Sequence, residues 1–269
     1  MTGALVRFEL AAARRTRTVP LFAIGFAAAS LAVALVGLSA GGAVAVQGFA
    51  RTSVSLLQLV VWVIPLLALL TGAVAGAECL ELEFVVGLPV ARPRLVLARW
   101  AAWSLTLGAA LIIGFGVAGL AIALLAGATD AGRYLALTTI ALLLLSAMIA
   151  TGLAIGVAAR TRARAVGIAI VMWFVLVVGV DLAAIGVLAI LPPRDAGWGL
   201  SLLLLADPAD AARALGLGLF RADVIAGPTG AALRRVLGGW GAWALVGGLG
   251  AWTVLPLWLG GRRFARHDL

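Results

Sequence analysis

The sequence predicts an all-α, polytopic membrane protein in which an amphipathic N-terminal helix is followed by six transmembrane helices. Hydrophobic residues make up 64% of the 269-residue chain. Soluble domains are roughly 45–50% apolar. The mean hydropathy is +1.17. The long apolar segments of the chain can cross a membrane only as α-helices, because backbone polar groups in lipid must be hydrogen-bonded within the segment. With roughly 20 apolar residues needed per crossing, we expect spans near 19–38, 54–77, 101–126, 134–159, 165–191 and 240–259.

The N-terminal segment, residues 1–18, carries four arginines and a single acid, Glu9. On a helical wheel the arginines share one face, while Leu5, Phe8 and Ala12 lie nearer the other. This pattern predicts an amphipathic helix on the cytoplasmic membrane surface. A cleaved signal peptide is the alternative. The basic region is too long for one, and the apolar block of about 20 residues is too extended.

The distribution of arginine predicts the orientation of the spans. The N-terminal segment holds four arginines, and the 78–99 stretch, the 160–164 linker and the C-terminal tail hold three each. The short loops on the other side hold only Arg51 and Arg133. By the positive-inside rule, we expect both termini in the cytoplasm of a bacterial inner membrane. The formal charge of +9 therefore reflects topology, and no nucleic-acid partner is expected.

The charged stretch at 78–99 interrupts an otherwise apolar half of the chain. Three carboxylates precede a Leu-Pro corner, and three arginines follow it. We interpret the stretch as a cytoplasmic loop that docks another protein. A solvated loop whose charges only mark the lipid boundary is the alternative. The residues expected to make the contact are Glu78, Glu81, Glu83, Pro89, Arg92 and Arg94.

The residue inventory argues against catalysis by this chain. There is no lysine, so no phosphate-binding Gly-x-x-x-x-Gly-Lys-Ser/Thr loop can form. One histidine, His267, and one cysteine, Cys79, exclude histidine clusters, an intrachain disulfide and a cysteine metal cage. We expect no cofactor and no metal site, and we interpret Cys79, Met148 and Met172 as packing residues, not copper ligands. The work of the chain would be mechanical or permeative, with energy supplied from elsewhere.

The long segment at 192–239 is expected to be a structured periplasmic loop with short amphipathic helices. It begins with the breaker Pro192-Pro193. Within it, Asp207 precedes Pro208, which is the pattern of an N-cap followed by proline at the first helical position.

Asp181 is the only acid well inside a predicted span. A charge there costs at least about 2.5–3.5 kcal/mol on insertion scales, so a role in a transport pathway is one hypothesis. The other is a protonated or hydrogen-bonded packing residue between helices, or one near the outer water boundary, and the sequence leaves both hypotheses open.

Two Gly-x-x-x-Gly pairs, Gly72/Gly76 and Gly152/Gly156, would permit close helix approach. With 34 glycines in the chain, however, such pairs are also expected by chance. The pattern alone predicts no particular helix contact.

Three motifs resemble those of ABC-2 type exporter permeases, and in particular of the NosY-like permeases of nitrous-oxide-reductase maturation transporters. The first is Glu78, Leu80-Glu81-Leu82 and Pro89-Val90-Ala91-Arg92, similar to the coupling segment of that family. The second is the run 207–215, similar to Asn-Pro-x-Asp-x-x-Arg-x-Leu, and the third is the ending 263–269, similar to Phe-x-Arg-Arg-Asp-Leu. Asp207 stands where the family usually has Asn, Ala91 where it has Ser, and a Gly-Thr before Leu-Glu is missing.

The resemblance implies one permease domain over 1–269, with the ABC-2 (type V exporter-like) fold, acting as a homodimer in membrane lipid. It implies a separate cytoplasmic ABC ATPase (NosF-like) on the 78–99 loop and a role in assembling the copper centres of nitrous oxide reductase. A periplasmic accessory protein (NosD-like) would contact Asp207, Asp210 and Arg213. An ABC-2 exporter of a drug, lipid or other hydrophobic substrate is the alternative function. An ATP-independent channel or carrier would show more intramembrane polar residues.

Overall fold

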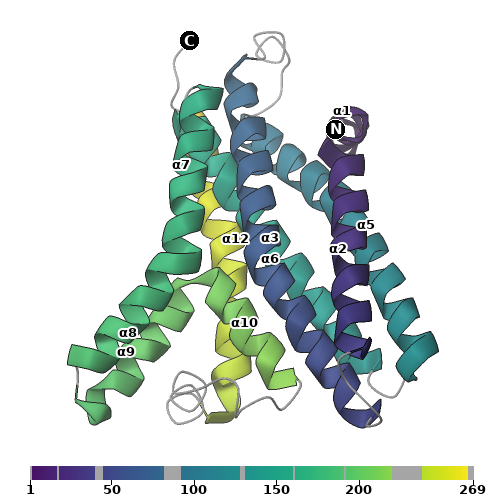
Figure 1. Ribbon diagram of the computed structural model, residues 1–269. Coiled ribbons are helices and arrows are strands. Elements are labelled where there is room, and N and C mark those ends of the chain that lie inside the picture. Colours follow the sequence, from purple (N-terminus) through teal and green to yellow (C-terminus); the bar gives the residue numbers. More distant parts are fainter. Residues whose placement is uncertain are drawn as a thin grey trace.

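The computed structural model describes residues 2–16, 18–39, 45–81, 92–127, 131–159, 161–190, 192–219 and 238–265. In this part of the chain, long helices run between the two ends of one bundle (Figure 1). The end that carries α1 and Ala265 is called the terminal end below, and the end that carries Ser39 and Ala131 is called the opposite end. The described helices are α1 (Thr2–Arg15), α2 (Thr18–Ser39), α3 (Ala45–Glu81), α5 (Arg92–Ala126), α6 (Ala131–Ala159), α7 (Arg162–Phe174), the π-helical η1 (Val175–Gly179), α8 (Val180–Ile190), α9 (Pro193–Ala206), α10 (Pro208–Leu219), the 3₁₀ turn η2 (Gly238–Trp240) and α12 (Gly241–Ala265).

The prediction of six membrane-spanning helices is confirmed within the described residues. The segments long and apolar enough to cross a bilayer are Val19–Val36, Ser55–Cys79, Pro93–Leu125, Ala131–Ala159, Arg162–Ile190 and Gly241–Ala265. The fifth of them combines α7, η1 and α8. Each overlaps one predicted span.

The charged stretch at 78–99 is less of a loop than expected. Helix α3 continues to Glu81 and α5 begins at Arg92, before the predicted start of the span at 101. Residues 82–91 lie outside the described residues. Glu78 and Arg99 of this stretch therefore lie on helices, where each contacts another helix, as described below.

Helix α3 packs most extensively against α6, and the two Gly-x-x-x-Gly pairs face each other in this contact. A Cβ added to Gly72 would lie 2.5 Å from the carbonyl oxygen of Ile149 and 3.1 Å from the Cα of Gly152. A Cβ added to Gly76 would lie 3.0 Å from the Cα of Gly156. Only glycine at these positions lets the two backbones touch.

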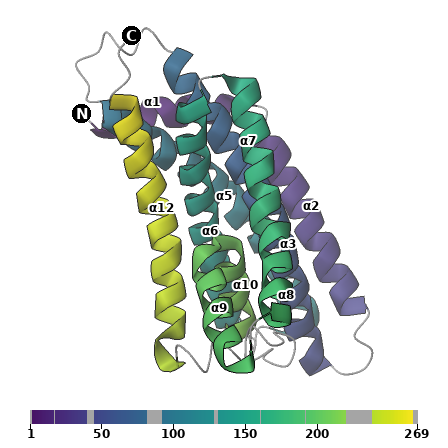
Figure 2. The ribbon, with the colours of Figure 1, turned by 90° about the vertical axis from the view of Figure 1, so that its left-hand side faces the viewer.

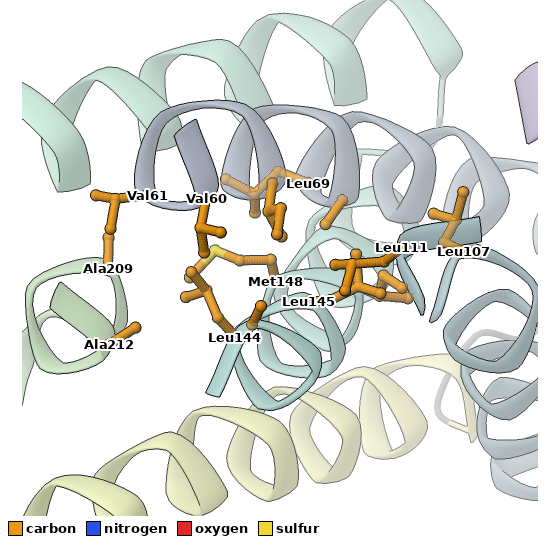
Figure 3. Close-up of a cluster of buried hydrophobic side chains, with 14 of the residues drawn as sticks. Val60, Val61, Leu69, Leu107, Leu111, Leu144, Leu145, Met148, Ala209 and Ala212 are labelled. Atoms are coloured by element: carbon orange, nitrogen blue, oxygen red, sulfur yellow. The ribbon is translucent and has the colours of Figure 1, made fainter. Parts of the chain in front are cut away.

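The buried core surrounds this contact, and the side chains labelled in Figure 3 come from α3, α5, α6 and α10. Side chains of α3 and α6 meet those of α5 on one side, and α10 contributes small residues on another. All the labelled members are buried: Val60, Val61, Leu69, Leu107, Leu111, Leu144, Leu145, Met148, Ala209 and Ala212.

The chain between the fifth and sixth spans turns back into the bundle. α9 and α10 form a helical hairpin whose junction, at Asp207, points inward from the opposite end (Figure 1). α10 packs against α3, α6 and α12. The predicted short helices of the 192–239 segment are therefore present, and those described belong to the bundle instead of lying outside it. Residues 220–237 of that segment lie outside the described residues.

We predict that Gly152→Ala destabilises the protein, because the new Cβ would collide with the backbone of α3. Overpacking of this kind costs about 1–3 kcal/mol, so the melting temperature of the detergent-solubilised protein should fall. Gly116→Ala is the matched control, since a Cβ there meets nothing within 4 Å and alanine favours the helix by about 1 kcal/mol. Equal melting temperatures for the two variants would contradict the glycine contact.

Candidate functional site

A buried arginine joins three helices near the terminal end. Arg99 of α5 donates from Nε to Glu9 Oε2 of α1 at 3.0 Å. Its Nη1 donates to the carbonyl oxygen of Ala75 at 2.8 Å and to Cys79 Sγ at 3.1 Å, both on α3. Arg99 and Glu9 are each only 5% exposed. Because an unpaired charge at such a site would be costly, this cluster holds α1, α3 and α5 in one arrangement.

Helix α1 lies across the terminal end of the bundle (Figure 2). The predicted N-terminal helix is thus present, and an acidic and a small residue lie on the side that packs against the bundle. Glu9 and Ala13, one turn apart, are buried against the bundle, whereas Phe8 is 67% exposed. The single acid of the segment is the residue that fixes α1 to α5, while Phe8 lies away from the bundle. The contact of the apolar face of α1 with the membrane surface stays a prediction.

Glu78 forms an ion pair with Arg162 at the terminal end. Arg162 Nη2 of α7 lies 3.3 Å from Glu78 Oε1 of α3, and both side chains are partly open to solvent. Arg94, in the first turn of α5, is exposed. The structure thus brings Glu78 of the charged stretch together with a residue of the arginine-rich 160–164 linker.

The other residues predicted to dock a partner lie outside what the structure describes. Glu83 and Pro89 fall within 82–91, and the side chains of Glu81 and Arg92 are not described either. Their part in a docking surface stays a prediction.

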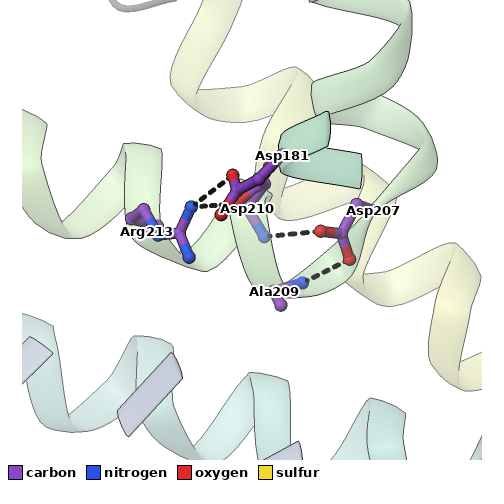
Figure 4. A network of polar contacts seen from close by, with 5 residues as sticks. All are labelled: Asp181, Asp207, Ala209, Asp210 and Arg213. Atoms are coloured by element: carbon purple, nitrogen blue, oxygen red, sulfur yellow. Dashed lines mark hydrogen bonds and ion pairs between the residues drawn. The ribbon is translucent and has the colours of Figure 1, made fainter. Parts of the chain in front are cut away.

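A network of four charged side chains links α8, α10 and the tip of the hairpin (Figure 4). Asp207, which is 0% exposed, accepts hydrogen bonds from the backbone N–H groups of Ala209 at 3.0 Å and Asp210 at 3.2 Å. Nη1 of Arg213 lies 2.6 Å from Asp210 Oδ1 and 3.0 Å from Asp181 Oδ1. The prediction of an Asp207 N-cap with Pro208 at the start of the helix is confirmed.

The surroundings of Asp207 shift the pKa of its carboxyl group. The pKa of Asp207 is raised to about 7, mainly by burial and also by the nearby Asp210, against the lowering effect of the two backbone N–H groups and Arg213. Burial also raises the pKa of Asp210, although Arg213 opposes the change. A pKa of about 7 places the protonation of Asp207 near neutral pH.

The predicted partner-contact residues Asp207, Asp210 and Arg213 come together, and Asp181 joins them. Asp207 is enclosed within the fold and its carboxylate is used by the cap, so Asp181, with its side chain 50% exposed, is the more accessible member. The ion pair with Arg213 gives Asp181 the interhelical bond that the packing hypothesis expects. A pathway role for Asp181 and a partner contact at this network stay predictions.

The soft side chains lie in helix contacts. Cys79 and Met148 are buried, and Cys79 accepts the hydrogen bond from Arg99. Among the described residues, no three His, Cys, Asp or Glu side chains come close enough together to hold a metal ion.

Comparison with known proteins places these features in one family. The chain is similar to ABC-2 family transporter proteins over residues 57–269. The probable ABC transporter permease protein NosY of Pseudomonas aeruginosa is 31% identical over 279 residues, which cover 98% of this chain and 96% of the relative. The probable NosY permease of Stutzerimonas stutzeri is 29% identical over 226 residues, covering 80% and 81% of the two chains.

We predict that Arg99→Met destabilises the protein, because it leaves the Glu9 carboxylate buried without its charged partner. Loss of one member of a buried pair costs about 3–5 kcal/mol, which a thermal melt of the purified protein measures. The double variant Glu9→Leu with Arg99→Met should recover part of the loss. Arg94→Met, on the exposed start of the same helix, is the control. A double variant no more stable than Arg99→Met would count against the pair.

We predict that Asp207→Asn flattens the pH dependence of stability, since the amide oxygen of asparagine keeps one of the two cap hydrogen bonds and the side chain does not titrate. The folded-state pKa of Asp207 is raised from 3.8 to about 7. Its protonated form is therefore favoured by folding, and the stabilisation is full below the unfolded pKa and lost as pH rises through the folded pKa. Melting curves between about pH 5 and pH 8 test this.

Asp207→Ala separates the cap from the charge in the same experiment. This variant also stops titrating but loses the two hydrogen bonds from Ala209 and Asp210, at a cost of about 1 kcal/mol. Asp207→Ala should therefore melt below Asp207→Asn at every pH. If the wild type and Asp207→Asn lose stability equally with rising pH, the raised pKa is contradicted.

Proposed function

Because the chain belongs to the ABC-2 family of transporter proteins and is a permease of an ABC transporter, we propose that it couples a separate cytoplasmic ATPase to a periplasmic partner in the maturation of the copper centres of nitrous oxide reductase. The ATP-hydrolysing subunit of such a transporter is a separate chain. The observation that carries the copper-centre role is the similarity to NosY permeases over nearly the whole length of both chains.

The ATPase, a NosF-like protein, would dock at the terminal end. Glu78, Arg162 and Arg94 present both signs of charge there, on three different helices. An exposed ion pair such as Glu78–Arg162 is worth about 0–1 kcal/mol, so a partner can replace it with contacts of its own at little cost. The remaining members of the docking surface would be Glu81, Glu83, Pro89 and Arg92.

The buried Arg99 cluster would carry the ATPase movement into the bundle. It fastens α1 and α5 to α3 a few residues from Glu78. Force applied at the terminal end would therefore move α1, α3 and α5 together, and α6 with them through the glycine contact. Two copies of the chain, each with one ATPase, would form the working homodimer.

The hairpin network would pass the movement to the opposite side of the membrane. Arg213 ties Asp181 of the fifth span to Asp210 of α10, so a tilt of α8 is transmitted to the hairpin. A NosD-like periplasmic protein would sense that change at the opposite end. Both termini would lie in the cytoplasm, in agreement with the arginine distribution.

We predict that charge reversal at the terminal end abolishes ATPase binding. Glu78→Arg and Arg94→Glu should each lower the amount of ATPase that co-purifies with the tagged permease from co-expressing membranes, by tenfold or more for about 1.4 kcal/mol of lost contact. Arg133→Glu is the matched control, because Arg133 lies at the opposite end. All three variants are first compared by thermal melting to establish that each is folded.

The copper-centre role is tested with the same variants in a denitrifying host that lacks its own NosY-like permease. Wild type and Arg133→Glu should restore a copper-loaded nitrous oxide reductase, measured by its copper content, whereas Glu78→Arg should not. ATPase binding that survives both reversals would refute the docking surface. A reductase that is fully loaded without any permease would refute the copper-centre role and favour an exporter of a hydrophobic substrate.

A further inference from the structure

An apolar groove lies between α6 and α12, with Ile168 of α7 also in its lining, and extends from the last turn of α12 to the hairpin. Its volume is about 660 Å³. Small residues form much of its lining, among them Ala154 and Ala158 of α6 and Gly248 and Ala251 of α12. Leu205 of α9 lies at one end and Arg263 at the other. None of the ion pairs seen among the described residues involves Arg263.

The dimensions of the groove suit a hydrocarbon chain. Gly248 and Arg263 both line it, so it is about 22 Å long at the rise of an α-helix. A groove about 22 Å long also fits within one hydrocarbon core of about 30 Å.

The charged end of the groove lies at the level where phospholipid headgroups are expected. Trp258, one turn before Arg262, is a residue type that gathers at the membrane interface. The guanidinium of Arg262 lies 3.7 Å from the centre of the Trp258 ring, so Arg262 is engaged by an aromatic face. Arg263, the next residue, instead borders the groove, where its planar donors suit a phosphate group.

We propose that this groove holds one anionic phospholipid, with an acyl chain along α6 and α12 and the phosphate on Arg263. The apolar lining excludes water, and Leu205 ends the groove beside the hairpin that carries Asp207. A lipid bound there would support the hairpin and the sixth span, because it fills the space between them. This is a site for a resident membrane lipid and goes beyond the proposed function, since it requires neither the ATPase nor a periplasmic partner.

The test measures phospholipid retained by the delipidated permease after incubation with phosphatidylglycerol, by native mass spectrometry. Wild type should retain one lipid per chain. Arg263→Gln should weaken that binding about tenfold, as expected for the loss of a charge-assisted hydrogen bond. Arg262→Gln, one residue away and facing Trp258, should leave it unchanged. Phosphatidylcholine in place of phosphatidylglycerol should bind more weakly to wild type and equally to Arg263→Gln.

A second pair of variants tests the acyl chain. Ala251→Trp fills the groove and should abolish the bound lipid, whereas Val254→Trp, at an exposed position of α12 that does not line the groove, should not. With brominated phosphatidylglycerol, quenching of tryptophan fluorescence should include a component that Trp252→Phe removes, because Trp252 lines the groove.

Three outcomes would overturn the proposal. Equal losses in Arg262→Gln and Arg263→Gln would mean that binding depends on general charge only. Equal effects of Ala251→Trp and Val254→Trp would mean that the lipid belongs to an unspecific shell. A change of oligomeric state in Ala251→Trp with lipid binding unchanged would mean that a second copy of the chain covers the groove.

Discussion

The backbone contact between α3 and α6 is the constraint on which the rest of the bundle depends. Four glycines face each other there, and a side chain at Gly72 would press on the carbonyl of Ile149 at 2.5 Å. Where side chains separate two helices, rotamer changes can absorb a small shift. Where backbones touch, no such adjustment is available, so α3 and α6 move as one body.

Two further helices, α10 and α12, approach this pair closely at glycines. A Cβ added to Gly216 of α10 would lie 2.6 Å from Cδ1 of Leu57 on α3, and one added to Gly260 of α12 would lie 3.3 Å from the Cα of Ala154 on α6. The hairpin and the sixth span are therefore seated on the α3–α6 unit at positions far apart along it. Leu57 and Glu78 are separated by about 32 Å of helix, so α3 alone reaches from the hairpin to the terminal end.

The sequence predicted the spans well because a transmembrane helix is encoded locally, in about 20 consecutive residues. The N-cap at Asp207 was predictable for the same reason, since the cap and its donors lie within three residues. The buried pair of Glu9 and Arg99 was not, because its members are 90 residues apart and each resembles an ordinary surface charge in its own segment.

Other features of the fold and of the candidate site could not be predicted from the sequence, for different physical reasons. The glycine pairs were visible, but 34 glycines supply such spacings by chance, and only the facing of two helices distinguishes a contact from a coincidence. The inward course of the hairpin was hidden because α9 and α10 are too short to read as spans. The tie between Asp181 and Arg213 depends on that course and could not be inferred without it.

Helix α3 and the fifth span are both irregular where they contact each other, at Pro65 and at η1. A movement transmitted from the terminal end would have to pass this level. Pro65 lies inside α3 and, lacking an N–H, leaves the carbonyl of Val61 without its helical donor. Beside it, Trp173 Nε1 of α7 donates to the carbonyl of Trp62 at 3.2 Å, and the π-helical η1 begins two residues further on.

Pro65 of α3 and the π-helical η1 are therefore two sites of possible bending at one level of the bundle. Above them, towards the terminal end, α3 and α7 are tied by Glu78–Arg162. Below them, α8 is tied to the hairpin by Asp181–Arg213. Proline and π-helical segments are the places where helices bend, so a shift of the terminal end would be taken up there, while the glycine contact would keep the upper part of α3 on α6. The bend would then appear in α8, whose outward course away from the axis of α7 is visible in Figure 1, and the hairpin would follow it through Arg213.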